Sequence, residues 1–407
     1  MKRFLAIVGP GLLVAATGIG AGDLATAGFA GSYLGTALLW AVAVGALLKF
    51  VVTEGLARWQ LATGTTLLEG VTGKFGRGFG YGFLVYLAFW SFFVGSALMS
   101  ACGVTLHALF PVFSAAETGK VVFGVLSALT GWLLVLIGGY ALFEKLMKLC
   151  IAFMFVTVVV TAGLLWPGTA EVARGLFLPS IPELDSGGLG WTIALIGGVG
   201  GTVTVLCYGY WIREENRTGA EHLAASRIDL AAAYLVTALF GMAMIIIGST
   251  IEVEGRGAGL LVSLAGRLES VLGPAAGMAF LIGAFGAVFS SLLGVWQAVP
   301  YLFSDTLQQI RKPVAGVEPV DTRSLPYRGY LAALAIVPAA GLFIGFSSVQ
   351  KWYAMVGAWF FPALTLALLI LNNRRDWIGE RYRNGPAANA ALVIVLLFFS
   401  WVAMRSI

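Results

Sequence analysis

A single carboxylate, that of Asp23, lies within the first long apolar stretch, directly after the glycine-rich run 18–22 (GIGAG). Glycines weaken a helix, so this run predicts a break in a membrane-spanning helix. Unwound backbone in lipid is tolerated where it lines a cavity or binds a ligand, and an ionisable group there is costly. The pattern therefore predicts that Asp23 binds a ligand. The alternative is that Asp23 caps the second half of the helix.

A second glycine cluster, residues 197–204 (GGVGGTVT), interrupts a later apolar stretch. Thr202 and Thr204 offer hydroxyls beside the carbonyls that a break would free. Threonine in a membrane helix also bonds to its own backbone, which is the simpler reading of each hydroxyl. For both clusters the alternative to a broken helix is close packing between helices at small residues.

Other polar side chains within apolar stretches are candidates for a pathway or a gate. Lys49 and Glu54 lie in the second stretch, where Lys49 could pair with Asp23 or Glu54 or extend its ammonium to the membrane surface. The run 213–215 (REE) closes the sixth stretch and fits either a gate or a solvated helix end. A weaker polar strip in the eighth stretch consists of Ser290, Ser291 and Gln297.

Composition identifies the class of protein. Of the 407 residues, 59% are hydrophobic and 11% are charged, whereas a soluble chain carries about 25% charged residues. A soluble fold could not cover itself with so few charges, so a soluble enzyme, a nucleic-acid-binding domain and a disordered chain are excluded. A β-barrel would show alternating segments of about ten residues. We therefore predict an all-α polytopic membrane protein.

Eleven stretches are long enough to cross a bilayer, which takes about 20 residues. The breaks fall in the first and sixth, the equivalent positions of two five-span repeats, and an odd span number forces the repeats to be inverted. Interrupted helices at such positions indicate the central site of a transporter. A cleaved signal peptide, the alternative for the first stretch, fits poorly with Pro10 and Gly11. The predicted spans are 4–34, 36–57, 80–109, 119–139, 143–166, 190–211, 228–251, 274–304, 328–346, 352–371 and 388–405.

Lys and Arg residues predict the orientation. Of the 25, 18 lie on the side of the N-terminus, six lie on the other side and Lys49 lies within a span. The positive-inside rule therefore places the N-terminus in the cytoplasm and the C-terminus outside. We expect one transmembrane domain over 1–407, with repeat one at about 4–166, repeat two at about 190–371 and an extra helix at about 388–405. Compact loops suggest a bacterial inner membrane, and we expect a monomer.

Several motifs resemble the Nramp family of divalent-metal transporters. They are VGPGL at 8–12, LAT at 24–26, LLW at 38–40, ATG at 62–64 with LLE at 67–69, RID at 227–229 and LAIVP at 334–338. The resemblance implies the leucine-transporter fold, a 5+5 inverted repeat with helices 1 and 6 broken. It also implies alternating access, in which spans one, two, six and seven rock against the rest.

The sequence departs from this family at the metal site. Where the family has DPGN, residues 20–23 read GAGD, so the family's metal-binding Asp falls on Gly20 and its Asn falls on Asp23. The family's metal-binding Met falls on Thr204. An acidic pair that the family uses for proton movement aligns with Ala97 and Ser100.

These departures favour a hard cation, because thioethers prefer softer metals whereas carboxylates, hydroxyls and carbonyls suit Mg²⁺ and Mn²⁺. The magnesium-transporting relatives of Nramp resemble this chain in the same losses. The expected metal ligands are Asp23 and Thr204, assisted by the carbonyls of Gly20 and Gly201 and by Thr202. Loss of the proton-path acids predicts weak or absent proton coupling.

The sequence thus predicts a secondary transporter that moves Mg²⁺ or Mn²⁺ into the cytoplasm, with no cofactor and no enzymatic activity. The alternative on the same fold is a cation-coupled symporter of a small organic solute, which Lys49 would favour by neutralising Asp23. A non-transporting membrane protein such as a sensor is a third reading. Nucleic acid is not an expected partner.

Overall fold

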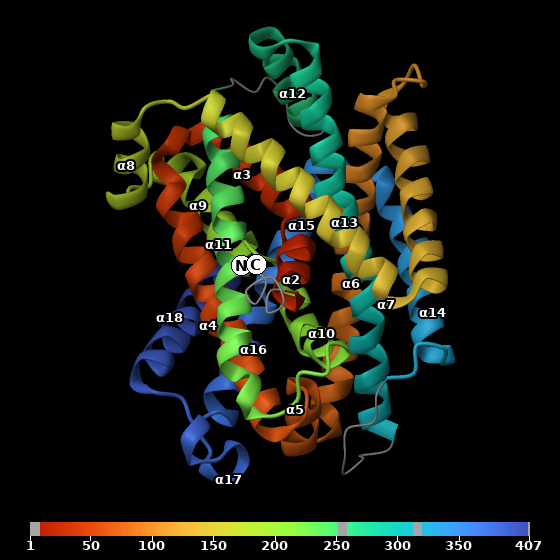
Figure 1. Cartoon of the computed structure of the whole chain (residues 1–407), viewed down its shortest axis with the longest axis vertical. Helices are drawn as coiled ribbons and strands as arrows, with labels where there is room; N and C mark the ends of the chain where they lie inside the picture. Colours follow the sequence, from red (N-terminus) through yellow and green to blue (C-terminus); the bar gives the residue numbers. More distant parts are fainter. Residues whose placement is uncertain (1–8, 251–258, 312–319, 406–407) are drawn as a thin grey trace.

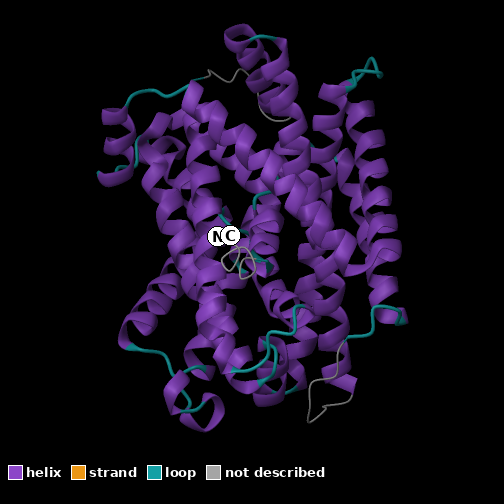
Figure 2. Ribbon diagram, in the orientation of Figure 1, coloured by secondary structure: helices purple, strands orange, loops and turns teal. Residues whose placement is uncertain are grey.

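Helices make up nearly all of the computed structural model, which describes residues 9–250, 259–311 and 320–405, and no strand occurs among these residues (Figure 2). The helices of the first half are α2 (Pro10–Gly18), α3 (Ala21–Leu34), α4 (Leu39–Thr63), α5 (Leu67–Phe75), α6 (Arg77–Leu109), α7 (Ala116–Leu164) and α8 (Thr169–Phe177). Those of the second half are α9 (Leu189–Gly198), α10 (Cys207–Glu214), α11 (Leu223–Gly248), α12 (Gly259–Leu272), α13 (Pro274–Arg311), α14 (Leu325–Ile336), α15 (Phe346–Ala358), α16 (Phe360–Leu371), α17 (Arg375–Ile378) and α18 (Pro386–Arg405).

The part of the chain that the structure describes contains nine helical stretches long and apolar enough to cross a membrane. Two of them each combine segments that the sequence analysis separates. Residues 23–63 hold the second half of the first predicted span and all of the second, and residues 116–164 hold the fourth and fifth. In the latter, α7 is interrupted at Gly139, whose φ of +58° is the left-handed backbone that glycine adopts readily. The all-helical fold class is confirmed, while residues 4–8 of the first predicted span and residue 251 of the seventh lie outside the described residues.

Both predicted breaks occur. Residues 19–20 separate α2 from α3, and residues 199–202 together with the 3₁₀ turn η3 (Val203–Leu206) separate α9 from α10. Figure 1 shows α2 and α10 near the centre of the molecule, between α11 and α13. In addition, α11 packs against α3 and α4, while α13 packs against α6 and α7. The discontinuous helices are therefore enclosed by continuous ones.

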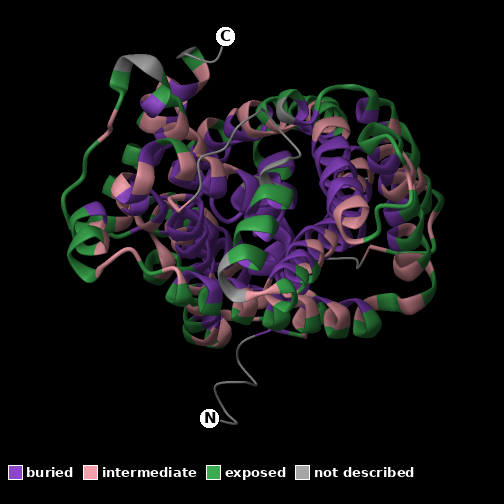
Figure 3. Cartoon of the chain, turned by 90° about the horizontal axis from the view of Figure 1, so that it is seen from above, coloured by how far each residue is buried: buried purple, intermediate pink, exposed green. Residues whose placement is uncertain are grey.

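Burial follows the pattern of a helical bundle in lipid. Buried residues face the interior and exposed residues lie on the outside (Figure 3). Large apolar side chains on the outside include Val85, Ile137 and Leu397, which are 73%, 82% and 65% exposed. Such exposure is unfavourable in water and is expected for a surface that contacts lipid.

The segments expected to be loops contain more helix than predicted. The predicted loop 58–79 holds the end of α4 and all of α5, and the loop 167–189 contains α8. The helix α5 starts with a capping box in which Thr66 and Glu69 exchange side chain–backbone hydrogen bonds. The loop 305–327 begins with the last residues of α13, and residues 312–319 lie outside the described part.

Candidate functional site

The two helix breaks meet in the interior of the bundle. A methyl group built on Gly18 would lie 2.6 Å from the carbonyl carbon of Gly200, so only glycine allows this approach. The backbone N–H of Gly200 donates a hydrogen bond to Oδ2 of Asp23 at 3.2 Å. Gly200 and Gly201 have φ values of +76° and +85°, which glycine adopts without strain. Glycine at these positions thus lets the breaks touch and turns an N–H toward the carboxylate.

Asp23 is 3% exposed and lies in the first turn of α3. The alternative role as an N-cap is wrong, because Gly20 occupies the cap position and no side chain caps this helix. The carboxylate instead reaches across to the other break. Its position near the N-terminus of α3 favours a negative charge, since the helix dipole is positive there.

Lys49 lies on α4 and is only 1% exposed. Its ammonium donates hydrogen bonds to the carbonyls of Gly197, Val199 and Gly201 at 2.9, 3.2 and 2.5 Å. No carboxylate among the described residues lies within ion-pair distance of it. The three expectations for Lys49, an ion pair with Asp23, an ion pair with Glu54 and an extension to the membrane surface, are therefore all wrong. Acceptors freed by the α9 break hold the ammonium instead.

This arrangement also changes the expected metal ligands. The carbonyl of Gly201 already accepts from Lys49, and the carbonyl of Gly20 accepts from the N–H of Leu24 at 3.1 Å. Neither carbonyl is as free as the sequence analysis expects. The side chains of Asp23 and Thr204 remain as candidate ligands. Thr204 is buried, and a methyl group built on Gly201 would lie 2.4 Å from its Oγ1.

Thr202 is engaged by an aromatic residue that the sequence analysis did not single out. The indole N–H of Trp90, on α6, donates to the Thr202 hydroxyl at 3.0 Å, and both side chains are buried. Tyr353 on α15 is an electrostatic neighbour of both Thr202 and Asp23. The only sequence signal for Trp90 is its position in the middle of a span, because Trp usually lies at the membrane surface.

The polar strip of α13 contacts the end of α2. The hydroxyls of Ser290 and Ser291 donate to the carbonyl of Ala16 at 3.3 and 3.0 Å. A methyl group built on Gly20 would lie 2.3 Å from Oγ of Ser291, so this serine fills the place of any side chain at position 20. Gln297 lies further along α13 and accepts from the indole N–H of Trp211 at 2.9 Å. The strip therefore stabilises the broken helices.

The two positions that align with the family's acidic pair are uncharged here. Ala97 and Ser100 are fully buried on α6, and the amide of Gln350 donates to the carbonyl of Ala97 at 3.3 Å. The Ser100 hydroxyl has no hydrogen-bond partner within the described chain. Over residues 9–250, 259–311 and 320–405, no three His, Cys, Asp or Glu side chains group together as a metal site.

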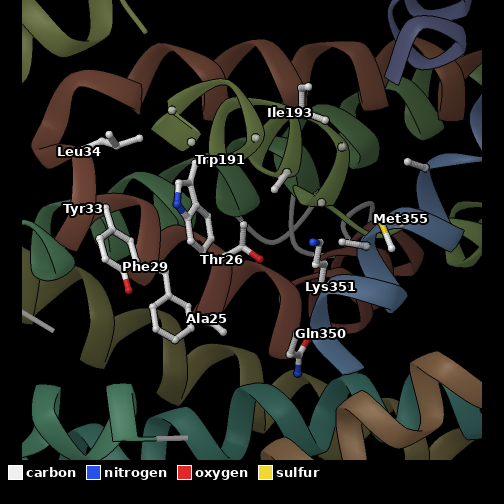
Figure 4. A pocket seen from close by; sticks show the side chains of 18 of the residues that line it. Ala25, Thr26, Phe29, Tyr33, Leu34, Trp191, Ile193, Gln350, Lys351 and Met355 are labelled. Atoms are coloured by element: carbon white, nitrogen blue, oxygen red, sulfur yellow. The ribbon is translucent and has the colours of Figure 1, made fainter. Parts of the chain in front are cut away.

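A cavity of 740 Å³ leads toward the breaks from the α3 side of the molecule. Figure 4 shows Phe29, Tyr33 and Trp191 on one part of its wall and Gln350, Lys351 and Met355 on another. Ala25 on α3 and Gly197 and Gly198 at the end of α9 also line it. The cavity therefore reaches the second break and the α3 residues that follow Asp23, while Asp23 itself is not part of its lining.

The opposite end is closed by a group of paired side chains, here called the end cluster: Thr66, Glu69, Tyr210, Arg213 and Asp305. Arg213 on α10 pairs with Glu69 on α5 at 2.7 Å. The hydroxyls of Thr66, at 3.1 Å, and of Tyr210 both donate to the carboxylate of Asp305 on α13. These bonds tie α10 to α5 and α13.

A second set of contacts holds the start of α2. The carboxylate of Asp229, on α11, accepts from the backbone N–H groups of Gly9 and Gly11 at 3.1 and 2.9 Å. It also accepts from Tyr208 at 3.1 Å and Arg217 at 3.3 Å. Asp229 therefore caps α2 from a different helix and joins it to α10.

The run 213–215 takes part in the same closure. Glu214 accepts from Tyr301 at 2.6 Å, and Glu215 pairs with Arg217 at 2.6 Å. Burial raises the pKa of Glu215, and the guanidinium of Arg217 opposes that shift. Glu214 is exposed and Glu215 is partly exposed, so this helix end is solvated while it also takes part in the closure.

Glu54, on α4, is held by two arginines. It pairs with Arg58 at 3.1 Å and with Arg227 at 2.8 Å. These bonds join α4 to α11, so Glu54 lies away from the Lys49 ammonium and links two helices.

Known relatives agree with this fold. A divalent metal cation transporter MntH of Pectobacterium carotovorum subsp. carotovorum (strain PC1) is 25% identical over 259 residues, covering 60% of this chain and 58% of the relative. An MntH of Yersinia pestis (strain Pestoides F) is 26% identical over 261 residues with the same coverage. The matched part is thus little more than half of the length of these relatives.

Solved structures show the likeness over the whole chain. A manganese transporter of Eremococcus coleocola, in complex with an aromatic bis-isothiourea substituted compound, has a TM-score of 0.76 at 18% identity and covers 100% of this chain and 86% of that one. MhsT in complex with L-phenylalanine has a TM-score of 0.54 at 18% identity, covering 96% and 98%. The model of the natural resistance-associated macrophage protein-like family matches residues 11–407, and the chain therefore belongs to the Nramp family.

Proposed function

We propose that this protein is a secondary transporter that carries a divalent cation, Mg²⁺ or Mn²⁺, into the cytoplasm. The observation that carries the proposal is the Asp23 carboxylate, buried at the junction of two broken helices with one backbone hydrogen bond. An ionisable group inside a membrane is costly and by default serves function. With no cation of the described chain in ion-pair contact, Asp23 keeps lone pairs for a cargo ion.

The ligand chemistry supports a hard and partly hydrated ion. Asp23 offers a carboxylate and Thr204 a hydroxyl, while the Lys49 ammonium takes the carbonyls of the second break. Magnesium dehydrates reluctantly and is commonly held by one or two carboxylates with several waters. A site with few protein ligands suits such an ion better than a soft metal, for which the chain lacks the thioether.

We propose that proton coupling is weak or absent. Ala97 and Ser100 provide no titratable group, and the neutral amide of Gln350 occupies the surroundings of Ala97. The inside-negative membrane potential would then drive uptake. A divalent ion gains about 4–5 kcal/mol per 100 mV, twice the single-charge value.

The two ends of the site indicate the conformation of the transporter and the path of the cargo ion. If the N-terminus is cytoplasmic, the 740 Å³ cavity faces the outside and the end cluster closes the inside. A cargo ion would enter past α3, α9 and α15 and reach Asp23. Opening of the contacts of α10 and α2 at the end cluster and Asp229 would release it inward.

Ion uptake into proteoliposomes tests the proposal. Purified protein is offered Mg²⁺, Mn²⁺ or Ca²⁺ under an inside-negative potential, with internal pH recorded. We expect saturable uptake that falls about tenfold or more in Asp23→Asn, since tenfold corresponds to only about 1.4 kcal/mol. Asp376→Asn, an exposed carboxylate on α17, is the matched control. Folded protein that moves no divalent ion would refute the metal proposal, and stoichiometric acidification would refute the proposal on coupling.

A second candidate is a symporter of a small organic solute. The observation that favours it is the size and lining of the cavity: 740 Å³ with Phe29, Tyr33 and Trp191 exceeds what an ion needs and suits an organic molecule. MhsT, of similar fold, was solved with L-phenylalanine. Uptake of radiolabelled amino acids by the same proteoliposomes would support this candidate if the divalent ions do not move.

A further inference from the structure

The buried ammonium of Lys49 has the surroundings of a bound monovalent cation. Three backbone carbonyls from one short segment accept its hydrogen bonds, at 2.9, 3.2 and 2.5 Å, and the ring of Phe361 lies 4.2 Å from it to the centroid. Carbonyl oxygens and an aromatic face are both ligands of cations. The three carbonyls come from the last turn of α9 and from the break after it, and Phe361 lies on α16.

The break creates this shell. The last carbonyls of a helix have no intrahelical donor, so the end of α9 leaves Gly197 and Val199 free to accept from elsewhere. Beyond them, Gly201 has a φ of +85°, and its carbonyl completes the set of alternate residues 197, 199 and 201. Lys49 reaches all three from α4, 148 to 152 residues earlier in the chain.

Two other lysines of the described chain are bound differently, by carboxylates. Lys120, on α7, is also buried at 2% exposure, but it pairs with Glu117 at 2.5 Å. Lys148 pairs with Glu144 at 2.5 Å. Lys49 instead meets uncharged carbonyl groups, with the charge of Asp23 nearby but outside ion-pair distance. The Lys49 ammonium therefore holds the unwound backbone in place, as a bound cation would.

We propose that Lys49 is a tethered cation that occupies a monovalent-cation site of the broken helix, so this transporter needs no free Na⁺ or K⁺ there. Removal of the side chain would leave a carbonyl cage open to a small monovalent cation from solution. The proposal refines the coupling of the proposed function, but the cage itself is testable without transport.

Thermal unfolding of the purified protein in detergent provides that test. We compare buffers of equal ionic strength containing Na⁺, K⁺, methylammonium or choline, the last being too large for the cage. Wild-type protein should show the same Tm in all four. Lys49→Ala should have a lower Tm in choline, because three buried carbonyls lose their donor. A saturable rise in Tm with methylammonium or Na⁺ should follow, recovering about half of the loss or more.

Two further variants separate charge from volume. Lys49→Met fills the space of the side chain without its charge, so it should lose stability and gain nothing from methylammonium. Lys120→Ala, at a second buried lysine of the described residues, should show no cation-specific recovery. If Lys49→Ala cannot be purified in choline, purification in methylammonium decides: recovery of folded protein supports the cage, and equal loss in both buffers refutes it.

The outcomes for this inference and for the proposed function are distinct. If Lys49→Met has the Tm of the wild type, or if the Tm of Lys49→Ala is the same with every cation, the proposal of a tethered cation is refuted. This holds whatever the uptake assay shows. In uptake, wild-type activity should not depend on external Na⁺, whereas Lys49→Ala activity should require Na⁺ or methylammonium. If the protein moves no divalent ion but Lys49→Ala shows a cation-dependent Tm, only the proposed divalent cargo is refuted and the tethered cation is supported.

Discussion

At the scale of single residues, the site differs from that expected for the family at Gly20, where the packing of Ser291 leaves no room for a side chain. Position 20 aligns with the family's metal-binding Asp, and here the Ser291 side chain occupies the space that a side chain would need. The nearby carboxylate is Asp23, which reaches the other break through Gly200. The serine and the displaced carboxylate are thus parts of one alternative arrangement.

This packing makes Gly20→Ala a direct test. A methyl group 2.3 Å from Ser291 Oγ must displace α13 or the first break, at a cost of about 1–3 kcal/mol for overpacking. We expect a lower Tm and reduced uptake. Gly82→Ala on α6 is the control, because a methyl group there meets no atom within 4 Å. Gly20→Ala combined with Ser291→Gly should regain stability, and failure to do so would contradict the steric explanation.

At the scale of elements, the half-helix α2 depends on a cap supplied by another helix. Its first residues have no side-chain cap of their own, and Asp229 of α11 accepts from Gly9 and Gly11 instead. A cap that comes from another helix can be lost when the helices move apart. This contact therefore couples the position of α2 to that of α11.

Asp229→Asn should release the start of α2. The NH₂ group of the asparagine would replace one carboxylate oxygen that now accepts a hydrogen bond from Gly9 or Gly11. One buried N–H would then lack an acceptor, which costs about 1–3 kcal/mol. Hydrogen exchange should become faster at the amides of α2 while α13 keeps its protection. Asp376→Asn serves as the control. Unchanged exchange in α2 would mean that other contacts hold this half-helix.

At the scale of the whole molecule, the bundle is open on the side of the cavity and closed at the end cluster. In the variant Met355→Cys, whose position lines the cavity, the thiol should react with a membrane-impermeant maleimide added outside. In Thr306→Cys, at a buried position next to Asp305, it should not react. The native Cys150, which is half-buried, is first replaced by Ser. Saturating cargo should slow labelling at position 355, and reaction at 306 alone would reverse the assignment of the open side.

The predicted orientation has its own test. Alkaline phosphatase fused after Ile407 should be active in bacteria, because that enzyme folds outside the cytoplasm, whereas a fusion at Asp321 should be inactive. The reason is the excess of Lys and Arg on the side of the N-terminus. The reverse pattern would place the cavity on the cytoplasmic side, so that this structure would be the inward-open conformation.

Much of the fold follows from local properties of the sequence. Hydropathy gives the spans because a helix must be about 20 apolar residues long to cross lipid. The clusters 18–22 and 197–204 give the breaks because glycine weakens any helix that contains it. The helices α5, α8 and α12 were missed, since short amphipathic helices outside the spans have no comparable signal.

The partners of the site residues required the tertiary structure. The sequence alone identifies Asp23 and Lys49 as ionisable groups inside spans. Burying a charge in lipid costs free energy, so both residues are candidates for a function. Only the folded chain brings Lys49 to carbonyls 148 to 152 residues away and Ser291 against Gly20. Span and break depend on neighbouring residues, whereas the choice of a hydrogen-bond partner depends on which helices pack together. For that reason the sequence determined the scaffold and its broken helices, and the packing decided how the charges within it are used.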